Sequence, residues 1–334
     1  MPSTYPPSSA PRFLVDIGGE EFHEYSGYIS DVVVDTTIEG ADHFTVVLTY
    51  PFDHEQVEFA DMDWSAFEPG TEVSIAMGYG EGSGSTADVF TGEISTVEPE
   101  FTKTAPPSVR ISGYCPLDGM MDGTDSASWE ETSLKGIVDE VAGEHLDSVT
   151  IEDADMELTR VFQNDQSPYR FVMQLAARYG FEFFSSLGEG YFRPSKGGNA
   201  PDDPVVTLYY GESMEAFSAA WSEPSVGEVE VRYWDENNKE EIVGTATGDG
   251  DEKEVYRIPV DSEGEAETIA EALIDSKTVT GVVDTFGIPS ILAGKVVELD
   301  GVGGTFNGDY YVTSATHRIG GDGYRMSFEV CELS

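Results

Sequence analysis

The chain has 334 residues, of which 64 are acidic and 17 are basic, so its formal net charge at pH 7 is −47. Proteins hold nucleic-acid phosphates and anionic lipid surfaces with clustered lysine and arginine, so this composition argues against sequence-specific nucleic-acid binding and against membrane adsorption. Because 39% of the residues are hydrophobic, the chain can still form packed cores. The acidic side chains repel one another unless molar salt screens their charges, which indicates a halophilic host. The acidic, lysine-poor composition resembles that of haloarchaeal proteins.

Targeting and cofactor signals are missing from the sequence. The N-terminus lacks the charged and apolar regions of a signal peptide, and no stretch approaches the roughly 18 apolar residues of a membrane helix. We therefore expect assembly in the host cytoplasm, with no membrane insertion and no cofactor. The cysteines, Cys115 and Cys331, match no metal or disulfide spacing and are predicted to be core residues. The histidines form no paired zinc motif, and His317 is predicted to pack or hydrogen-bond rather than catalyse.

The first third of the chain is predicted to be a β-barrel. Residues 1–11, rich in Pro and Ser, indicate a flexible arm, and residues 12–114 then alternate short hydrophobic runs with turns. This pattern is typical of an antiparallel barrel or sandwich. The Gly- and Ser-rich run 78–85 looks mobile and opens no helix, so it is not a phosphate loop. The predicted strands are 13–17, 31–34, 44–48, 72–77, 89–94 and 108–111.

Residues 115–204 are predicted to form a helix-and-hairpin α/β domain. A hydrophobic stripe at helical spacing indicates an amphipathic helix over 133–146. A second helix has clear boundaries, with Ser167 as N-cap, Pro168 in the first turn and Gly180 as the stop signal. The strands that follow it are predicted to pair as a hairpin and cover 181–184 and 190–193.

The remaining residues are predicted to form a second β-barrel with an insertion. The barrel is assigned to residues 205–235 and 285–334, where strand patterns dominate. The insertion, residues 236–284, begins with a polar, acidic and glycine-containing excursion over 236–254. One further helix is expected over 265–278.

Three segments of the second barrel resemble three segments of the first. Pro69–Ile75 aligns with Ala293–Leu299, Phe90–Val97 with Phe306–Thr313, and Ser108–Ile111 with Tyr324–Phe328. Such a repeat predicts two related barrels, although any two β-meanders share some glycine spacing. The predicted turn positions of the repeat, where glycine suits a positive φ, are Gly70, Gly92, Gly294 and Gly308.

One acidic loop has the spacing of a calcium site. Its positions 1, 3, 5, 7, 9 and 12 are Asp61, Asp63, Ser65, Phe67, Pro69 and Glu72. Position 6 is Ala66 rather than the glycine that the sharp turn requires, and no helices are expected on either side. A solvated loop between strands is therefore expected here, and no metal site is assigned.

Four passages together resemble the phage late control gene D family, which includes tail hub proteins of contractile phages and the N-terminal part of VgrG-type spikes. The most characteristic passage is 163–183, in which the helix passes into the hairpin through Leu175-Ala176-Ala177-Arg178-Tyr179-Gly180-Phe181. The other three passages are 67–75 with 89–94, 231–235, and 301–313 with His317. They occur in the family's order across about residues 12–334.

The resemblance implies a non-enzymatic structural protein of the tail tip or baseplate. Its fold would be mainly β, with two related antiparallel barrels, an inserted α/β segment and a homotrimeric, pseudo-six-fold arrangement. The implied partners are the tail tube, central spike and baseplate wedge proteins, and the tape measure protein. The chain ends at Ser334, just after the second barrel, so the spike is expected to be a separate chain. The particle could be a virus or an injection device.

Two other functions are compatible with the composition alone. A halophilic hydrolase with a β-rich catalytic domain requires a pocket with convergent titrating groups. With 64 acidic residues, carboxylate pairs arise by chance and do not identify one. A surface- or receptor-binding tail module would instead show exposed aromatic residues on one face and no ring assembly.

Overall fold

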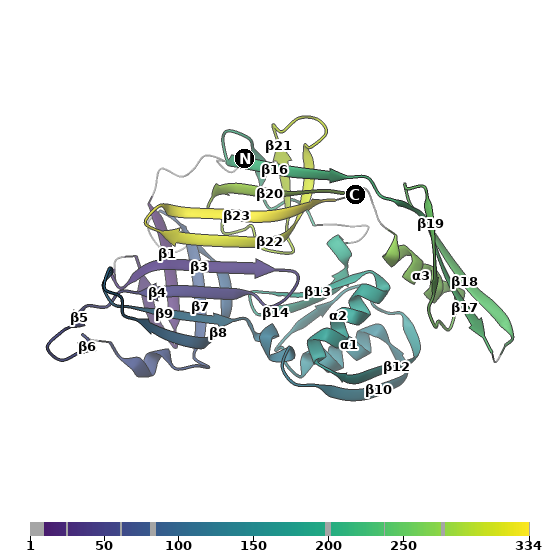
Figure 1. Cartoon of the computed structure of the whole chain (residues 1–334), viewed down its shortest axis with the longest axis horizontal. Coiled ribbons are helices and arrows are strands. Elements are labelled where there is room, and N and C mark those ends of the chain that lie inside the picture. Colours follow the sequence, from purple (N-terminus) through teal and green to yellow (C-terminus); the bar gives the residue numbers. More distant parts are fainter. Residues whose placement is uncertain are drawn as a thin grey trace.

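The computed structural model describes residues 10–24, 26–60, 62–80, 85–197, 202–236, 238–274 and 278–333. The protein is mainly β, as the sequence predicted, with a long sheet, a helical segment beside it and a small sheet beyond that segment (Figure 1). Most of the predicted arm and residues 81–84 of the Gly/Ser run lie outside the described residues. No helix in the described ranges is long and apolar enough to cross a membrane.

The first half of the long sheet contains every strand that was predicted between residues 12 and 114. Side chains alternate along these strands, so that Val15 and Ile17 are buried while Asp16 is half-buried. This period of two directs one face toward the core and the other toward water. The strands are β1 (Pro11–Ile17), β2 (Glu20–His23), β3 (Ile29–Thr37), β4 (His43–Leu48), β7 (Glu72–Tyr79), β8 (Thr86–Glu100) and β9 (Ser108–Tyr114).

The second half of the long sheet repeats the strand order of the first half. The first half runs β3-β4-β9-β8-β7-β1 and the second runs β16-β20-β23-β22-β21-β15, so equivalent strands occupy equivalent places. The aligned sequence segments fall on β7 and β21, β8 and β22, and β9 and β23. One pairing differs, because β1 is antiparallel to β7 whereas β15 is parallel to β21. The second set is β15 (Thr207–Tyr209), β16 (Met214–Ser222), β20 (Thr278–Phe286), β21 (Val296–Asp300), β22 (Gly308–Gly320) and β23 (Gly323–Glu332).

The two halves are joined into one continuous sheet, which the sequence did not predict. β3 pairs with β22 in antiparallel register from Ser314 opposite Thr37 to Ile319 opposite Val32. A side-chain contact reinforces this seam, since the backbone N–H of Ala293 donates to Oγ1 of Thr36 at 3.0 Å. The relative position of the two halves is therefore fixed by backbone hydrogen bonds rather than by side-chain packing alone.

The helical segment has the predicted order of elements. The Oγ of Ser167 accepts a hydrogen bond from the N–H of Arg170, and Gly180 ends α2 (Pro168–Tyr179) with a φ of +76°. The helix predicted over 133–146 is shorter, because α1 (Leu134–Gly143) ends before Leu146. The accompanying strands are β10 (Asp125–Ser133) with β12 (Glu157–Gln166), and β11 (Val149–Ile151) with β14 (Glu189–Pro194) and β13 (Phe181–Ser186).

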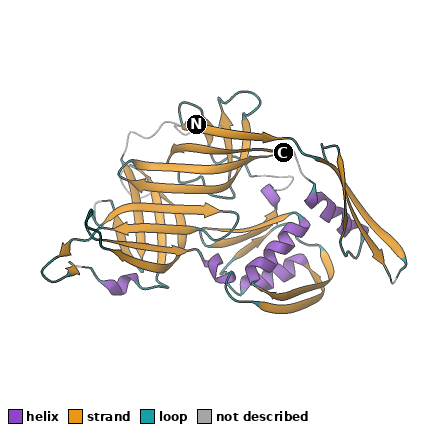
Figure 2. Ribbon diagram, in the orientation of Figure 1, coloured by secondary structure: helices purple, strands orange, loops and turns teal. Residues whose placement is uncertain are grey.

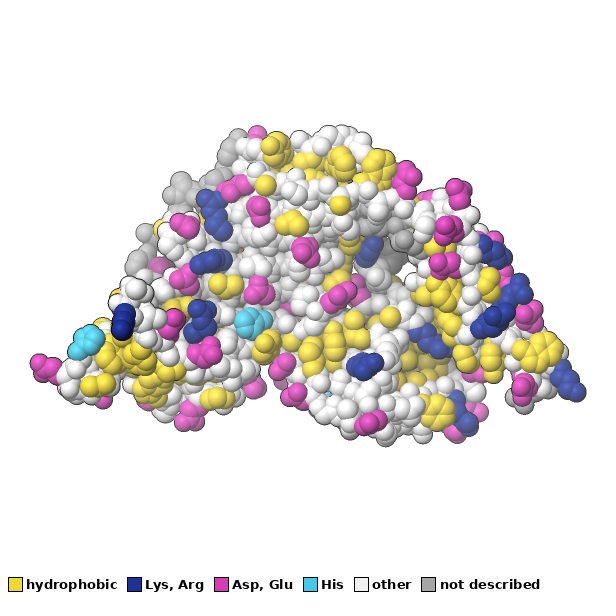
Figure 3. All heavy atoms as spheres, viewed as in Figure 1, with side chains coloured by type: hydrophobic (Ala, Val, Ile, Leu, Met, Phe, Trp, Pro, Cys, Tyr) yellow, Lys and Arg dark blue, Asp and Glu magenta, His cyan; other side chains and the backbone are white. Residues whose placement is uncertain are grey.

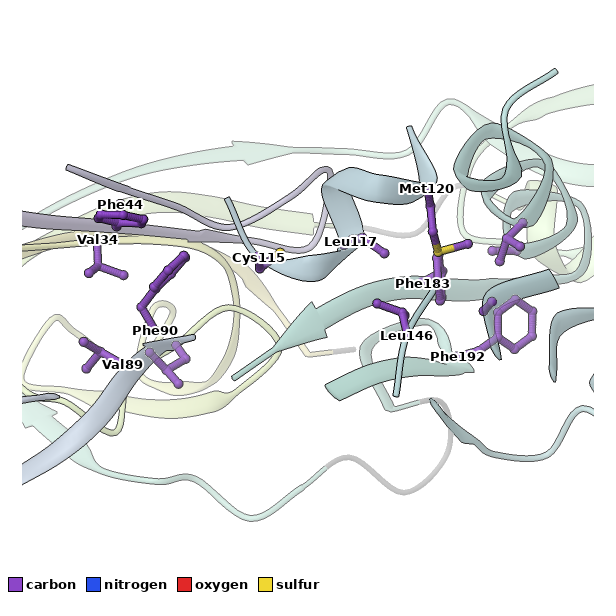
Figure 4. Packing of buried hydrophobic residues seen from close by; sticks show 14 of the residues in the cluster. Val34, Phe44, Val89, Phe90, Cys115, Leu117, Met120, Leu146, Phe183 and Phe192 are labelled. Carbon is purple, nitrogen blue, oxygen red and sulfur yellow. The ribbon is translucent and has the colours of Figure 1, made fainter. Parts of the chain in front are cut away.

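A continuous apolar core connects the first half of the long sheet with the helical segment (Figure 4). Phe44 and Phe90 lie at its sheet end and Phe183 at its other end, with Cys115 and Leu117 between them; all five are buried. Because burial stabilises apolar surface by about 25 cal/mol per Å², these two parts stabilise one another. The second half of the sheet has a core of its own.

Residues 226–273 form a small unit that corrects the predicted boundaries. β17 (Val226–Asp235), assigned by sequence to the second barrel, instead lies between β18 (Glu240–Thr247) and β19 (Glu252–Arg257) in a three-stranded sheet. α3 (Glu263–Leu273) covers this sheet (Figure 2) and ends five residues before the predicted boundary. Gly244 seemed to mark an exposed excursion, but it allows close packing: a Cβ there would lie 2.1 Å from the carbonyl carbon of Ala266.

Candidate assembly surfaces

The calcium-like loop is held by its own hydrogen bonds. Asp63 precedes the short 3-10 helix η1 (Trp64–Phe67), and its Oδ1 accepts from the N–H of Ser65 at 3.0 Å and from the Ser65 hydroxyl at 2.7 Å. Phe67 is buried, and Asp61 lies outside the described residues. Within the described ranges, no three His, Cys, Asp or Glu residues are grouped in a way that could hold a metal ion.

His317 has the structural role that its sequence context predicted. It is fully buried, and its Nε2 donates to the carbonyl of Ile291 at 2.8 Å. The Nδ1 atom therefore accepts from the hydroxyl of Tyr324 at 2.7 Å. Burial lowers the pKa of His317 to about 4, so the ring is neutral at pH 7.

Both cysteines are buried, as predicted. The Sγ of Cys115 lies 3.1 Å from the hydroxyl of Ser185 and accepts from the N–H of Asp42 at 3.2 Å. Burial raises the pKa of Cys115 to about 11 and also raises the pKa of Cys331. A buried thiol with a raised pKa is a poor nucleophile, so neither cysteine has the environment of a catalytic residue.

Three of the four repeat glycines have a positive φ. The φ is +86° at Gly70, +83° at Gly294 and +152° at Gly308. Gly92, also assigned to a turn, instead lies inside β8. There it is needed for close approach, because a Cβ would lie 2.2 Å from the carbonyl oxygen of Tyr114. The aligned glycines Gly92 and Gly308 thus have different physical roles in the two halves: Gly92 permits close packing, whereas Gly308 has a positive φ.

A buried polar network ties the helical segment to the second half of the sheet. Nε of Arg193, on β14, donates to Glu182, on β13, at 2.9 Å. One terminal nitrogen of Arg193 donates to the carbonyl of Gly294 at 2.7 Å, and the hydroxyl of Tyr311 donates to Glu182 at 2.6 Å. Burial opposes the charge on Arg193, but its hydrogen bonds with Tyr311 and Glu182 and the negative charge of Glu182 hold its pKa above the ordinary value.

Sequence reasoning did not identify this network, although one signal was available. Glu182 and Arg193 are directly opposite each other across the predicted hairpin. Opposite charges at directly paired positions of neighbouring strands attract one another. The third partner, Tyr311, is distant in sequence, and only the tertiary structure brings it to the pair.

An exposed aromatic cluster lies beside a projecting hairpin, and we call it the hairpin patch. β5 (Phe52–Asp53) and β6 (Glu58–Phe59) form the hairpin, around which hydrophobic side chains gather at one end of the molecule (Figure 3). Val57 is 73% exposed and Phe101 is 60% exposed. Beside them is a hollow of about 650 Å³. The patch consists of Phe52, Val57, Phe59, Trp64 and Phe101. Its aromatic rings are in contact at centroid distances of 5.2–5.9 Å.

A second apolar surface lies at the far end of the long sheet, and we call it the edge patch. It consists of residues 218–221 of β16, the last strand of the sheet, and residues 280–282 of β20. Small side chains around Gly281 leave a hollow of about 470 Å³. Trp221 is 50% exposed and Val282 is 42% exposed at its rim.

Nearly all the acidic charge of the described residues lies at the surface. Only Asp42, Glu182 and Glu230 are buried among their carboxylates. The visible face of the molecule carries scattered acidic side chains between the apolar patches (Figure 3). Molar salt would screen the repulsion between acidic side chains placed at the surface in this way.

Comparison with known proteins identifies the family. A family model described as phage tail baseplate hub (GPD) matches residues 37–323. The fold is similar to a Neisseria meningitidis MC58 tail protein (TM-score 0.69, 14% identity, 97% of each chain covered). It is also similar to the 43 kDa tail protein of prophage MuSo2 from Shewanella oneidensis (TM-score 0.69, 15% identity, 96% of this chain and 98% of that chain).

A component of a type VI secretion system has the same fold. The Escherichia coli protein c3393 matches with a TM-score of 0.59 and 11% identity, over 92% of this chain and 74% of that chain. None of the curated proteins matches the sequence. The matched family comprises structural tail components rather than enzymes, which removes the hydrolase alternative. The chain belongs to the phage tail baseplate hub (GPD) family.

Proposed function

We propose that this hub protein forms a homotrimer that joins a six-fold tail tube to a three-fold central spike. The observation that carries the proposal is the repeated strand order within one continuous sheet. Three copies of a chain with two similar halves present six similar units, and closed rotational symmetry is the usual form of a soluble homo-oligomer. The helical segment and the small sheet would face outward, toward baseplate wedge proteins.

The two apolar patches suit a ring. A three-fold contact is heterologous, so each subunit needs two different surfaces that complement each other. The hairpin patch lies at one end of the molecule, whereas the edge patch lies on β16 and β20 along the top of the view (Figure 1). We assign the contact between neighbouring subunits to the hairpin patch of one copy and the edge patch of the next.

The charge of −47 supports a haloarchaeal contractile virus or injection particle as the setting. At molar salt the Debye length is about 3 Å, which permits close packing of acidic subunits. Acidic side chains along a central channel would repel the phosphates of passing DNA and keep DNA from adhering.

Light scattering after size-exclusion chromatography in molar NaCl tests the proposal. We expect the mass of three 36.3 kDa chains. Val57→Asp in the hairpin patch and Trp221→Asp in the edge patch should each yield monomers, while Arg160→Met, far from both patches, should remain trimeric. A monomeric wild-type protein at every salt concentration would contradict the trimer.

The salt dependence is a separate measurement. Lowering the salt to about 0.1 M lengthens the Debye length to about 10 Å, so repulsion between acidic subunits should loosen the trimer. An unchanged trimer at low salt would refute the screening argument and leave the ring assignment intact.

A further inference from the structure

A groove of about 870 Å³ lies between the helical segment and the small unit, and we call it the outer groove. Residues 158–162 of β12 form one wall, and residues 258–261 with α3 form the other. Side chains of α2 lie between the two walls, with Phe171 and Leu175 buried there. The groove is separate from both surfaces that we assign to the ring.

The β12 wall presents the edge of a strand. β12 pairs with β10 alone, so its other edge has no strand partner among the described residues. Successive side chains of a strand point to opposite faces, so a groove that touches five consecutive residues approaches the strand along its backbone edge. Unpaired N–H and C=O groups on such an edge can accept an added strand.

The side chains of the groove combine apolar surface with a partly exposed arginine. Phe162 is 55% exposed and Tyr233 is 36% exposed on its two sides. Arg178 donates to the carbonyl of Pro259 at 2.7 Å and to Glu265 at 3.2 Å, while its buried Nε has no acceptor among the described residues. Glu265 is already occupied by Arg178 and by the hydroxyl of Tyr179.

The charge of the groove differs from that of the whole molecule. Its lining contains Arg160 and Arg178 against Asp261 and Glu265, so it is locally balanced in a chain with 64 acidic and 17 basic residues. This step rests on the halophilic setting of the proposed function: a partner adapted to molar salt would itself be acidic, and a groove with balanced charge repels such a partner least.

We propose that the outer groove binds an extended, acidic and apolar segment of a partner protein. The segment adds a strand to the free edge of β12 and places apolar side chains between Phe162 and Tyr233. Its carboxylate approaches the guanidinium of Arg178, whose side chain is 33% exposed. This site does not depend on the trimer and would serve attachment of an outer component.

A capped peptide, Val-Thr-Asp-Thr-Val with an N-terminal fluorescein, is the probe. In an extended conformation its two Val and its Asp share one face. Fluorescence anisotropy with the full-length protein in molar NaCl should show saturable binding with a dissociation constant of about 1 mM or tighter. Replacing the Asp of the peptide with Asn should weaken binding about tenfold, because a charge-assisted hydrogen bond is lost.

Three controls separate strand addition from general stickiness. A peptide N-methylated at its two Thr residues keeps its side chains but loses backbone donors, and we expect it not to bind. Phe162→Asp should abolish binding. Phe101→Asp, at a similarly exposed aromatic residue in the hairpin patch, should leave binding unchanged.

Several outcomes would overturn the inference. They are absence of saturable binding, undiminished binding of the N-methylated peptide, and equal loss in the two Phe variants. If the wild type forms assemblies larger than the trimer and Phe162→Asp abolishes these larger assemblies, a second copy of the chain occupies the groove. The oligomeric state is measured in the same samples, so loss of the ring and loss of peptide binding are distinguished.

Discussion

Substitution of Arg193 by Met should strongly destabilise the contact between the helical segment and the second half of the sheet. The side chains of Arg193 and Glu182 are only 10% and 7% exposed. Met preserves most of the length of the arginine stem but removes the donors to Glu182 and to the carbonyl of Gly294. Glu182 would then be a buried carboxylate without its counter-ion.

Removing one partner of a buried ion pair typically destabilises a protein by about 3–5 kcal/mol, because the remaining charge stays desolvated. Glu182 keeps the hydroxyl of Tyr311 and the N–H of Lys196 as donors, which puts the expected loss near the lower end, about 3 kcal/mol. The double variant Arg193→Met with Glu182→Gln removes both charges and retains an acceptor for Tyr311. Its expected cost is about 1 kcal/mol, mainly from the lost bond to Gly294.

Urea unfolding in molar KCl, followed by circular dichroism, measures both free energies. Arg160→Met provides a matched control, because Arg160 and Glu130 are 57% and 65% exposed and should contribute less than about 1 kcal/mol. A single variant that is no less stable than the double variant would refute the reasoning.

Three further substitutions test other features. Gly294→Ala should lower the melting temperature more than Gly70→Ala, because both residues have a positive φ but only Gly294 would place a Cβ 2.5 Å from the Phe184 ring. The folded-state pKa of His317, about 4, lies below its unfolded value, so the unfolding free energy of the wild type should fall by about 3 kcal/mol between pH 6.5 and pH 4. A His317→Gln variant whose unfolding free energy falls equally over this pH range would show that His317 is not the cause. Burial raises the pKa of Asp42 to about 7, so the stability contributed by its neutral form is lost as the pH rises from 4 to 7. At pH 8 the Asp42→Asn variant should therefore be more stable than the wild type by up to about 4 kcal/mol. Unfolding curves of variant and wild type that coincide at pH 8 would contradict the raised pKa.

Local signals in the sequence were sufficient for most individual elements. Ser167, Pro168 and Gly180 located α2 because capping and left-handed stop positions depend on a few neighbouring residues. Alternation of apolar and polar residues located the strands between residues 12 and 114 for the same reason. In the second half it missed β16, and the predicted insertion 236–284 took in most of β20, which belongs to the long sheet. The helix expected over 265–278 was too long, because periodicity does not show where packing against a sheet ends.

The small unit shows where local signals mislead. Gly244 and its acidic neighbours resemble an exposed loop by composition, yet they form a strand under α3. A glycine that permits close packing and a glycine that permits a turn look alike in a single sequence. The assignment of β17 to the second barrel was wrong for a related reason, since a strand pattern does not name its partner strand.

The sequence by itself determined the mainly β fold, the order of the elements, the repeat and the acidic surface, because each follows from local pattern or composition. The tertiary structure decided what joins them: the pairing of β3 with β22, the network of Glu182, Arg193 and Tyr311, and the two exposed apolar patches. These contacts connect residues far apart in the chain. Their energies depend on the distances between these residues and on their burial, and both are known only from the folded structure.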